Sequence, residues 1–296
     1  MTELICNTHN IRVKHKGCVA TIGNFDGLHL GHKKIIARTL EIARENGLKP
    51  AVITFEPHPV SLFRPEKLPI RLTTFKDKIE LLEDEGIKEV IVLKFNKAFA
   101  EMSAEEFVKL LGQNHVITGE DFCFGKARQG NSALLKQSLG EKYYAISPQG
   151  GDEKYSSSIV RKALKTGDIA KANMVLGHNY FVQGRVVNGK GDGKKFGFPT
   201  ANIKFRTGLI RPQYGVYAVK TNFGVGVANF GIRPTLDGNN ELLEVHIFGF
   251  NENIYGKKLK VEFLEFIRPE LKFGSIEELK KQIKEDCERA KAIHSK

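Results

Sequence analysis

The sequence predicts an α/β domain with a parallel sheet, followed by an all-β domain that forms a small antiparallel barrel and ends in a helix. Two observations lead to this fold class. Between about residues 18 and 176, short apolar runs alternate with helical patterns, which is typical of a parallel sheet covered by helices. After residue 180 the apolar runs follow one another without helices, which is typical of a barrel. We therefore expect two domains, residues 1–177 and residues 178–296.

The composition is compatible with two domains that each bury a core. The chain has 296 residues, of which 41% are hydrophobic, and a formal net charge of +12. Its lysines are spread along the chain, which favours a solvated basic surface over a nucleic-acid-binding face. No apolar run approaches a membrane span, and the first residues do not resemble a secretory signal. The four cysteines form no CxxC pair, so we expect free thiols and a cytoplasmic protein.

The first predicted strand and helix enclose a glycine-rich turn. Residues 18–25 form an apolar run, and residues 31–46 have helical spacing that stops at Asn-Gly. A turn of this kind exposes backbone N–H groups, and the helix start adds a positive partial charge, so the segment suits a phosphate. Gly23, Phe25 and Asp26 are therefore candidate phosphate-binding residues.

Two histidines lie at the start of the same helix. His29 and His32 are three residues apart, so they share one helix face and could stabilise charge on a reacting phosphate. An ordinary turn with two exposed histidines also explains the pattern. A zinc pair is disfavoured, because no nearby Cys or His cluster completes a site.

The remaining elements of the first domain follow the same alternation. Further strands are predicted at residues 50–55, 89–95, 115–119 and 142–146, and helices at residues 76–85 and 104–111. The segments GNFDGLHLGH, FEPHP and TGEDFCFG each follow a strand, so they should converge on one crevice at the carboxyl ends of the strands. His58, Asp121 and Phe122 are candidate ligand-binding residues there, although packing alone also explains these loops.

A run of serines precedes a further predicted helix. The segment YSSSIVR at residues 155–161 places hydroxyl and N–H groups at a helix start and an arginine one turn later. Ser157, Ser158 and Arg161 therefore suit the phosphates of ATP. Taken alone, the segment is an ordinary serine N-cap.

The second domain begins after a helix at residues 169–176. Strands are predicted at residues 180–187, 215–221, 224–230, 242–248 and 258–266. The final helix begins at Ser275, which forms a capping box with Glu278, and its apolar stripe predicts packing against the barrel.

Three segments of the second domain carry polar candidates. A glycine-rich loop could wrap phosphates through its N–H groups and a lysine, although a hairpin turn also explains it. The candidates in this loop are Gly189, Gly191, Gly193 and Lys194. Thr200 and Asn202 follow in GFPTAN, and Glu244 shares one strand face with His246.

These motifs together resemble one family. GNFDG with HxGH and SSSxxR is similar to the nucleotidylyltransferase superfamily, and most similar to the adenylyltransferase half of bacterial bifunctional riboflavin kinase/FAD synthetases. GFPTAN and the strand that carries Glu244 resemble the riboflavin kinase half. The motifs occur in the family order from about residue 18 to residue 290. The departures at Tyr155 and Ser158 keep the needed polarity. Lys194 supplies charge but not the bidentate fork of the usual arginine, and Val245, in place of the usual threonine, should face the core. Cys123 stands where the family usually has a basic or polar residue.

The resemblance implies two reactions in two domains. A Rossmann-like domain, residues 1–177, would convert FMN and ATP to FAD and pyrophosphate, and the barrel, residues 178–296, would convert riboflavin and ATP to FMN. In the first domain it implies that His29 and His32 stabilise the reacting phosphate. Ser157, Ser158 and Arg161 would bind the leaving pyrophosphate, while His58, Asp121 and Phe122 would lie on the flavin side.

For the kinase, the resemblance implies that Glu244 is the general base for the riboflavin 5′-hydroxyl. Thr200 and Asn202 would help to hold Mg2+, whose preference is for oxygen ligands. The glycine-rich loop would bind ATP, and Arg268 the flavin. FMN and FAD would be substrate and product rather than tightly held groups.

We expect riboflavin, FMN, FAD and ATP as the partners, with no nucleic acid and no membrane, and a monomer or weak homo-oligomer. Three alternatives stay open. A nucleotidylyltransferase with another acceptor leaves the GFPTAN barrel unexplained. A basic RNA-binding protein would bind RNA in a salt-sensitive way without flavin turnover. A flavin-binding module with an inactive kinase is disfavoured by Thr200, Asn202 and Glu244.

Overall fold

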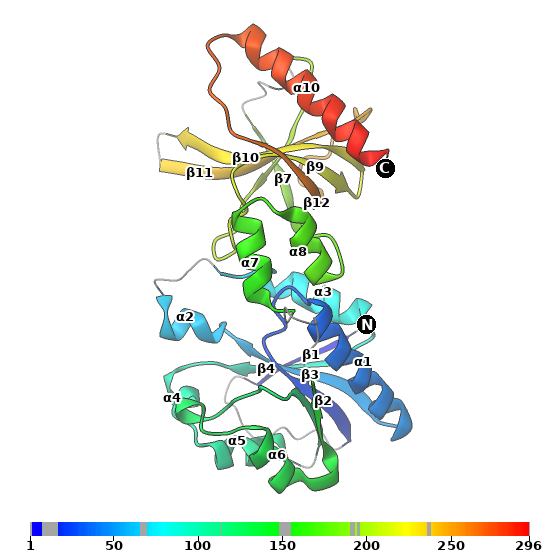
Figure 1. Cartoon of the computed structure of the whole chain (residues 1–296), viewed down its shortest axis with the longest axis vertical. Coiled ribbons are helices and arrows are strands. Elements are labelled where there is room, and N and C mark those ends of the chain that lie inside the picture. The colour runs from blue at the N-terminus through cyan, green and yellow to red at the C-terminus, as the bar shows by residue number, and fades with distance from the viewer. Residues whose placement is uncertain are drawn as a thin grey trace. The chain divides into compact units, whose positions relative to one another are not determined.

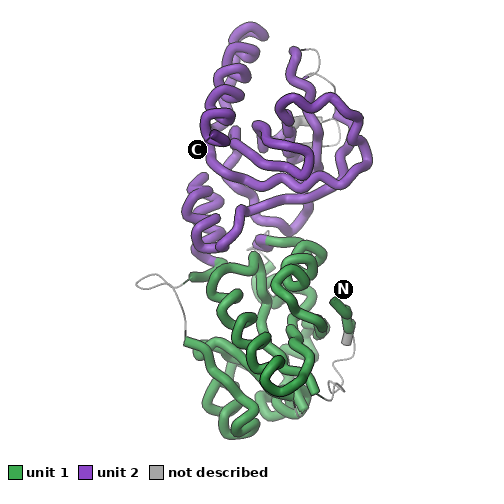
Figure 2. The backbone as a smooth tube through the Cα atoms, turned by 90° about the vertical axis from the view of Figure 1, so that its right-hand side faces the viewer, with its two compact units in different colours: residues 1–68, 73–157 green, residues 69–72, 158–296 purple. Residues whose placement is uncertain are grey.

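The computed structural model describes residues 2–7, 17–65, 70–112, 114–147, 155–189, 193, 196–235 and 238–295. The chain forms two compact units (Figure 2). One comprises Met1–Leu68 and Thr73–Ser157, and the other comprises Pro69–Leu72 and Ser158–Lys296. Gly191 and Lys194, two of the residues expected to bind ATP, lie outside the described residues.

A six-stranded parallel sheet forms the centre of the first unit (Figure 1). Its strands are β1 (Glu3–Asn7), β2 (Cys18–Ile22), β3 (Lys49–Glu56), β4 (Glu89–Lys94), β5 (His115–Gly119) and β6 (Tyr143–Ile146). They lie in the order β1-β4-β3-β2-β5-β6. The predicted parallel sheet is confirmed. β1 was not predicted, because its five residues, ELICN, are too few and too polar at their ends to give a strand pattern.

Helices cover both faces of this sheet. They are α1 (Leu30–Glu45), α2 (Pro59–Phe63), α3 (Phe75–Asp84), α4 (Lys97–Ala100), α5 (Ala104–Leu111) and α6 (Ser132–Leu139). Neighbouring residues of one strand point to opposite faces. On β3, Ile53 joins the core under α5 and α6, whereas Val52 joins the core under α1 and α3. No helix in the described part of the chain has both the length and the apolar character that a membrane span needs.

The second unit contains a closed antiparallel barrel. Its strands are β7 (Phe181–Val187), β8 (Ala201–Lys204), β9 (Gly215–Thr221), β10 (Gly224–Thr235), β11 (Gly238–Ile247) and β12 (Lys258–Pro269), in the order β10-β11-β8-β7-β12-β9. Tyr217, Phe230 and Phe263 fill its interior. The predicted barrel is confirmed. β8 was not predicted, since four residues after Pro-Thr give too short a pattern.

Three helices accompany the barrel: α7 (Ser157–Lys165), α8 (Ile169–Leu176) and α10 (Ile276–His294). The sequence places the domain boundary after residue 177, whereas the compact units divide between Ser157 and Ser158. Hydrogen bonds of Asn173 explain why α8 belongs to the same unit as the barrel. The side-chain N–H group of Asn173 donates to the backbone oxygen of Phe263 (2.9 Å), and its oxygen accepts from the N–H group of Tyr180 (2.7 Å).

The start of α10 differs in one detail from the expected capping box. Ser275 caps the helix by accepting a hydrogen bond from the N–H group of Glu278. The Glu278 carboxylate accepts from the N–H group of Gly274 (2.9 Å), one residue before the expected donor. The cap therefore satisfies two backbone donors, as a capping box does, but with a shifted partner.

The four cysteines should differ strongly in reactivity. Burial raises the pKa of Cys18 to about 12 and that of Cys287 to about 11. Cys6 is exposed and Cys123 is half-buried. Because the thiolate is the reactive form, we expect iodoacetamide at pH 8 to alkylate Cys6 and Cys123 in the folded protein and all four cysteines in urea. Peptide mass spectrometry measures this, and alkylation of Cys18 as fast as Cys6 under native conditions would contradict it.

Candidate functional site

The turn between β2 and α1 has a strained backbone. Phe25 (φ 48°) and Leu28 (φ 44°) adopt the left-handed conformation, on either side of Gly27 (φ 80°). A residue with a side chain costs about 1–3 kcal/mol in such a conformation, which persists only where the surroundings fix it. Here the side chains of Phe25 and Leu28 are fully buried, in the core that also contains Ile36. The turn is therefore fixed in shape by what lies beneath it.

Asp26 closes the turn from within. Its carboxylate accepts hydrogen bonds from the N–H group (3.2 Å) and the hydroxyl group (3.4 Å) of Thr73, and only 4% of the residue is exposed. The Thr73 hydroxyl also accepts from the N–H group of Gly27 (3.3 Å), and the Ser157 hydroxyl donates to the backbone oxygen of Asp26 (2.9 Å). The Asp26 carboxylate thus stabilises the turn itself, and the predicted role of this residue at the phosphate stays a prediction.

Gly23 makes a structural contact within the sheet. Its N–H group donates to the backbone oxygen of Ile53 (3.0 Å), so this donor is engaged within the sheet. A Cβ atom at this position would lie 3.2 Å from the Phe25 ring. The glycine therefore allows the Phe25 ring to pack closely over the strand end, and it does not offer its N–H group to a phosphate.

His29 and His32 lie together, as their spacing predicts. Their rings stack with centroids 3.7 Å apart and planes at 22°. The His32 ring also lies 5.0 Å from the Phe25 ring, between centroids. A Cβ atom at Gly31 would come within 3.1 Å of the His29 ring, which explains the glycine of the HxGH motif. The two imidazoles thus form one compact group at the positive end of α1.

The serine segment divides between the two units. Ser157 belongs to the first unit, and Ser158 and Arg161 belong to the second. The Arg161 Nε donates to the backbone oxygen of Ile70 (2.6 Å). The predicted roles of these three residues at the pyrophosphate stay predictions.

Of the residues predicted on the flavin side, His58 has a structural partner. It is the N-cap of α2, where its Nδ1 accepts from the N–H group of Val60 (3.2 Å). Asp121 is exposed, and Phe122 stacks on Phe124 with centroids 5.7 Å apart. Sequence reasoning missed Asn24, whose side-chain oxygen is buried with no hydrogen-bond partner among the described residues. The sequence could have indicated Asn24 as a site residue, because it lies inside the GNFDG motif.

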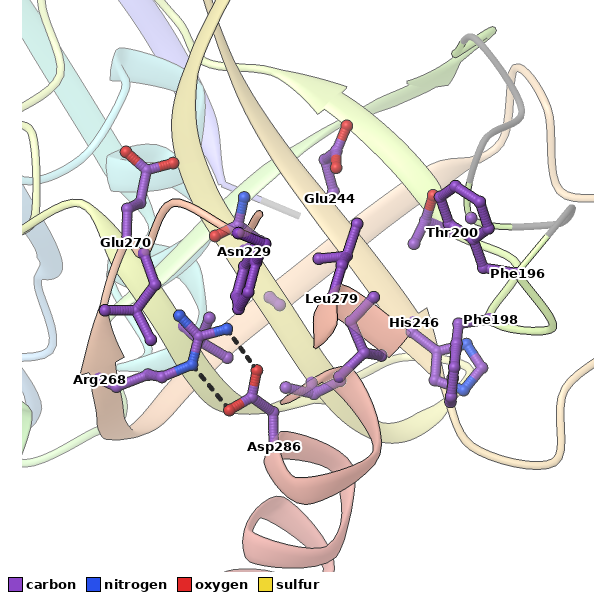
Figure 3. Close-up of a pocket in the computed structure, with 17 residues that line it drawn as sticks. Phe196, Phe198, Thr200, Asn229, Glu244, His246, Arg268, Glu270, Leu279 and Asp286 are labelled. Carbon is purple, nitrogen blue, oxygen red and sulfur yellow. Dashed lines mark hydrogen bonds and ion pairs between the residues drawn. The ribbon is translucent and has the colours of Figure 1, made fainter. Parts of the chain in front are cut away.

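The second unit contains a cavity of roughly 310 Å³ (Figure 3). Polar side chains from separate strands point into it, and apolar side chains of the 196–200 segment and α10 line another part. The polar lining includes Thr200, Asn229, Glu244, His246 and Arg268. Three residues that the sequence predicted from distant segments, Thr200, Glu244 and Arg268, therefore meet at one cavity.

Strand register places Glu244 between two amides. On β11 it lies opposite Asn202 of β8 and opposite Asn229 of β10. Residues opposite each other in an antiparallel pair share one face of the sheet. The His246 ring Nδ1 lies 2.8 Å from the backbone oxygen of Pro199, which ties the segment before β8 to β11. The register thus explains how segments far apart in sequence form one polar cluster.

Gly189 and Gly193, the described glycines of the glycine-rich segment, lie close to Asn202 and Thr200. A Cβ atom at Gly189 would fall 2.3 Å from the Asn202 amide nitrogen, and one at Gly193 would fall 3.2 Å from the Thr200 hydroxyl. Asn202 is 4% exposed, and its side-chain oxygen has no hydrogen-bond partner among the described residues. An unpartnered buried oxygen beside a hydroxyl and a carboxylate fits a hard cation such as Mg2+. By contrast, no group of three His, Cys, Asp or Glu side chains in the described ranges could hold a metal, which gives no support to a zinc site.

A bidentate ion pair joins β12 to α10 at the cavity wall. The Arg268 Nε lies 2.8 Å from one carboxylate oxygen of Asp286, and its terminal nitrogen lies 2.6 Å from the other (Figure 3). Both side chains are largely buried, and Gln282 donates to the same carboxylate (3.2 Å). Arg268, predicted to bind the flavin, is therefore also the anchor of α10. The sequence predicted only a structural role for α10, but Leu279 of this helix also lines the cavity. The acidic Asp286 on its apolar face was the signal in the sequence for this second role.

Comparisons with known proteins cover both units. The FAD synthetase family model matches residues 11–158, and the riboflavin kinase family model matches residues 176–294. A bifunctional riboflavin kinase/FMN adenylyltransferase from Haemophilus influenzae is 41% identical, over 98% of this chain and 99% of the relative. The protein of the same name from Bacillus subtilis is 38% identical, over 95% and 94%. A solved structure described as a macrolide-efflux protein from Streptococcus pneumoniae has a TM-score of 0.86 at 29% identity, covering 96% of this chain and 97% of its own.

Removal of one partner from the Arg268–Asp286 pair should destabilise the protein far more than removal of one partner from an exposed pair of the same helix. Asp286→Ala leaves the largely buried guanidinium without its bidentate partner, and we expect this to cost about 2–3 kcal/mol, since the group keeps its bond to the Pro269 oxygen. The exposed Lys291–Glu288 pair is the control, and Glu288→Ala should cost less than about 1 kcal/mol. Urea unfolding followed by circular dichroism measures both. Equal effects of the two substitutions would contradict the proposed anchor.

Proposed function

The chain belongs to the bifunctional riboflavin kinase/FMN adenylyltransferase family, and from this premise we propose how its residues divide the two reactions. The enzyme phosphorylates riboflavin to FMN and adenylylates FMN to FAD. We assign the second reaction to residues 1–177 and the first to residues 178–296. The observation that carries this division is that each unit gathers its own polar group, the stacked histidines in one and the Thr200–Asn202–Glu244 cluster in the other.

In adenylyl transfer, a phosphate oxygen of FMN forms a bond to the α-phosphorus of ATP, and the bond to the pyrophosphate oxygen breaks. The attacking oxygen is already anionic, so the protein supplies no nucleophile. His29 and His32 stabilise the charge on the reacting phosphate at the start of α1. The N–H groups of Phe25 and Asp26 bind the phosphates from the strained turn, whose shape the burial of Phe25 and Leu28 supports.

The remaining residues of this reaction bind the leaving pyrophosphate and the flavin. Ser157, Ser158 and Arg161 bind the pyrophosphate that leaves, by hydroxyl groups and a charged donor. On the flavin side, Asp121 and Phe122 contact FMN from the loop after β5. His58 acts through its backbone position, because its ring caps α2.

In the kinase reaction, Glu244 accepts the proton of the riboflavin 5′-hydroxyl while that oxygen attacks the γ-phosphorus and ADP leaves. Asn202 and Asn229 flank the carboxylate across the strand register and orient it. The glycine-rich loop holds the ATP phosphates close to Thr200, as the short Cβ distances at Gly189 and Gly193 support. Arg268 binds the flavin, and its ion pair with Asp286 fixes the position of its guanidinium group.

The kinase site fits Mg2+ through the side-chain oxygens of Thr200 and Asn202. Held there with ATP, Mg2+ would neutralise charge on the phosphates. FMN and FAD enter and leave as substrate and product. We further propose that the protein acts in the cytoplasm as a monomer or weak homo-oligomer, without nucleic acid or membrane partners. Its four free cysteines and dispersed lysines support this proposal.

Substitutions in the two groups should separate the two activities. We expect His29→Ala with His32→Ala to abolish FAD formation and to leave FMN formation intact. We expect Glu244→Ala to lower FMN formation by about 10²–10⁴-fold while FAD is still made from added FMN. Chromatography of the flavins over time measures both rates, and each unaltered reaction is the control for folding. Loss of both activities from a folded variant would contradict the division.

The magnesium dependence tests the oxygen cluster separately. Asn202→Leu removes a buried oxygen, so we expect the Mg2+ concentration for half-maximal kinase activity to rise at least about tenfold, the scale on which metal-site residues act. Asn251→Leu, at an exposed position of the same unit, is the control. An unchanged Mg2+ dependence in active Asn202→Leu enzyme would remove Asn202 from the metal site.

A further inference from the structure

Lys78 is a buried lysine that the proposed mechanism does not use. It lies on α3 and is 6% exposed. Its Nζ lies 5.4 Å from the centroid of the Phe75 ring. Lysine is rarely buried, because removal of its charge from water is costly. The groups that Nζ contacts should therefore explain why the lysine lies there.

Two of these contacts lie at the turn between β2 and α1. The Lys78 Nζ donates to the backbone oxygen of Asn24 (3.2 Å) and to the hydroxyl of Thr54 (3.1 Å). The Thr54 hydroxyl lies 3.5 Å from the same Asn24 oxygen, and Thr54 is fully buried. Two side chains from α3 and β3 thus converge on a single carbonyl oxygen of the turn.

This contact determines where the next N–H group points. The carbonyl and N–H groups of a trans peptide point in opposite directions, and the peptide between Asn24 and Phe25 is trans. When Lys78 and Thr54 hold the Asn24 oxygen, the Phe25 N–H group points away from them. Phe25 itself has the strained φ of 48°, so this peptide needs support to keep its orientation.

We propose that Lys78 is a positioning residue for adenylyl transfer. It fixes the Asn24–Phe25 peptide so that the Phe25 N–H group faces the ATP phosphates, and it places a positive charge behind the anion-binding turn. This inference rests on the proposed function of the turn that precedes His29. In the protein interior such a charge acts on a nearby anion more strongly than it would in water.

A purely structural lysine would behave differently on substitution. Lys78→Met keeps the length and apolar stem but removes the charge and the hydrogen bonds. Methionine fills the same space and leaves no charge buried without a partner, so the substitution avoids the cost of an unpaired buried charge. A positioning role therefore predicts loss of adenylyl transfer without loss of stability, whereas a structural role predicts a lower melting temperature and general loss of the site.

The experiment measures both reactions of the full chain with Lys78→Met. We expect kcat/KM for ATP in FAD formation to fall about 100-fold, the scale of one lost anion-stabilising donor. The KM for FMN and the rate of FMN formation should stay within about twofold of wild type, and the melting temperature should not fall. Lys76→Met is the matched control on α3, because the Lys76 side chain is 71% exposed, and it should change none of these values.

A second pair of variants tests the same carbonyl contact and keeps the test decisive if Lys78→Met does not fold. Thr54→Val should lower kcat/KM for ATP several-fold, and Thr54→Ser, which keeps the hydroxyl, should restore it. Full FAD synthesis by folded Lys78→Met, an equal loss of FMN formation, or equal activities of the two Thr54 variants would overturn the proposal. Wild-type protein that made FMN but no FAD would contradict the proposed adenylyl function itself, and the inference with it.

Discussion

The first unit depends on one constraint, a short turn after β2 that must hold a strained backbone in a fixed shape. The strain at Phe25 and Leu28 is offset by burial of both side chains. Hydrogen bonds from Thr73 and Lys78 then fix the polar groups of the turn from the protein side. Because these partners come from the segment after residue 70, the turn is complete only when distant parts of the unit have folded.

The second unit meets a similar requirement with strand register. Closure of the barrel puts Asn202, Glu244 and Asn229 side by side on three neighbouring strands, so no strained turn is needed to assemble them. The largely buried Arg268–Asp286 pair then joins α10 to β12 at the cavity wall. In both units, buried polar contacts around the site define its geometry, and such contacts often add specificity of structure rather than stability.

The sequence predicted the two architectures because hydrophobic periodicity is strong over long segments, and it missed β1 and β8 because each is too short to show a period. In the second unit it predicted the segments of Thr200, Glu244 and Arg268, which meet at one cavity, but it did not predict which atoms are engaged. The motif cannot show that the Gly23 N–H group is used within the sheet. Nor can it show that the His58 ring caps a helix. Lys78 gave no signal, since a lysine in an amphipathic helix is ordinarily solvent-exposed.

The chemistry explains why such supporting residues matter. Phosphoryl and adenylyl transfer need little covalent participation by the protein, so their rates depend on the positions of donors and charges around the reacting phosphorus. An enzyme of this kind is sensitive to the orientation of a single peptide, such as the one between Asn24 and Phe25. Residues that never touch a substrate can then control turnover, provided that they fix a group that does. The contacts of Lys78 and Thr54 with one carbonyl oxygen are of this type.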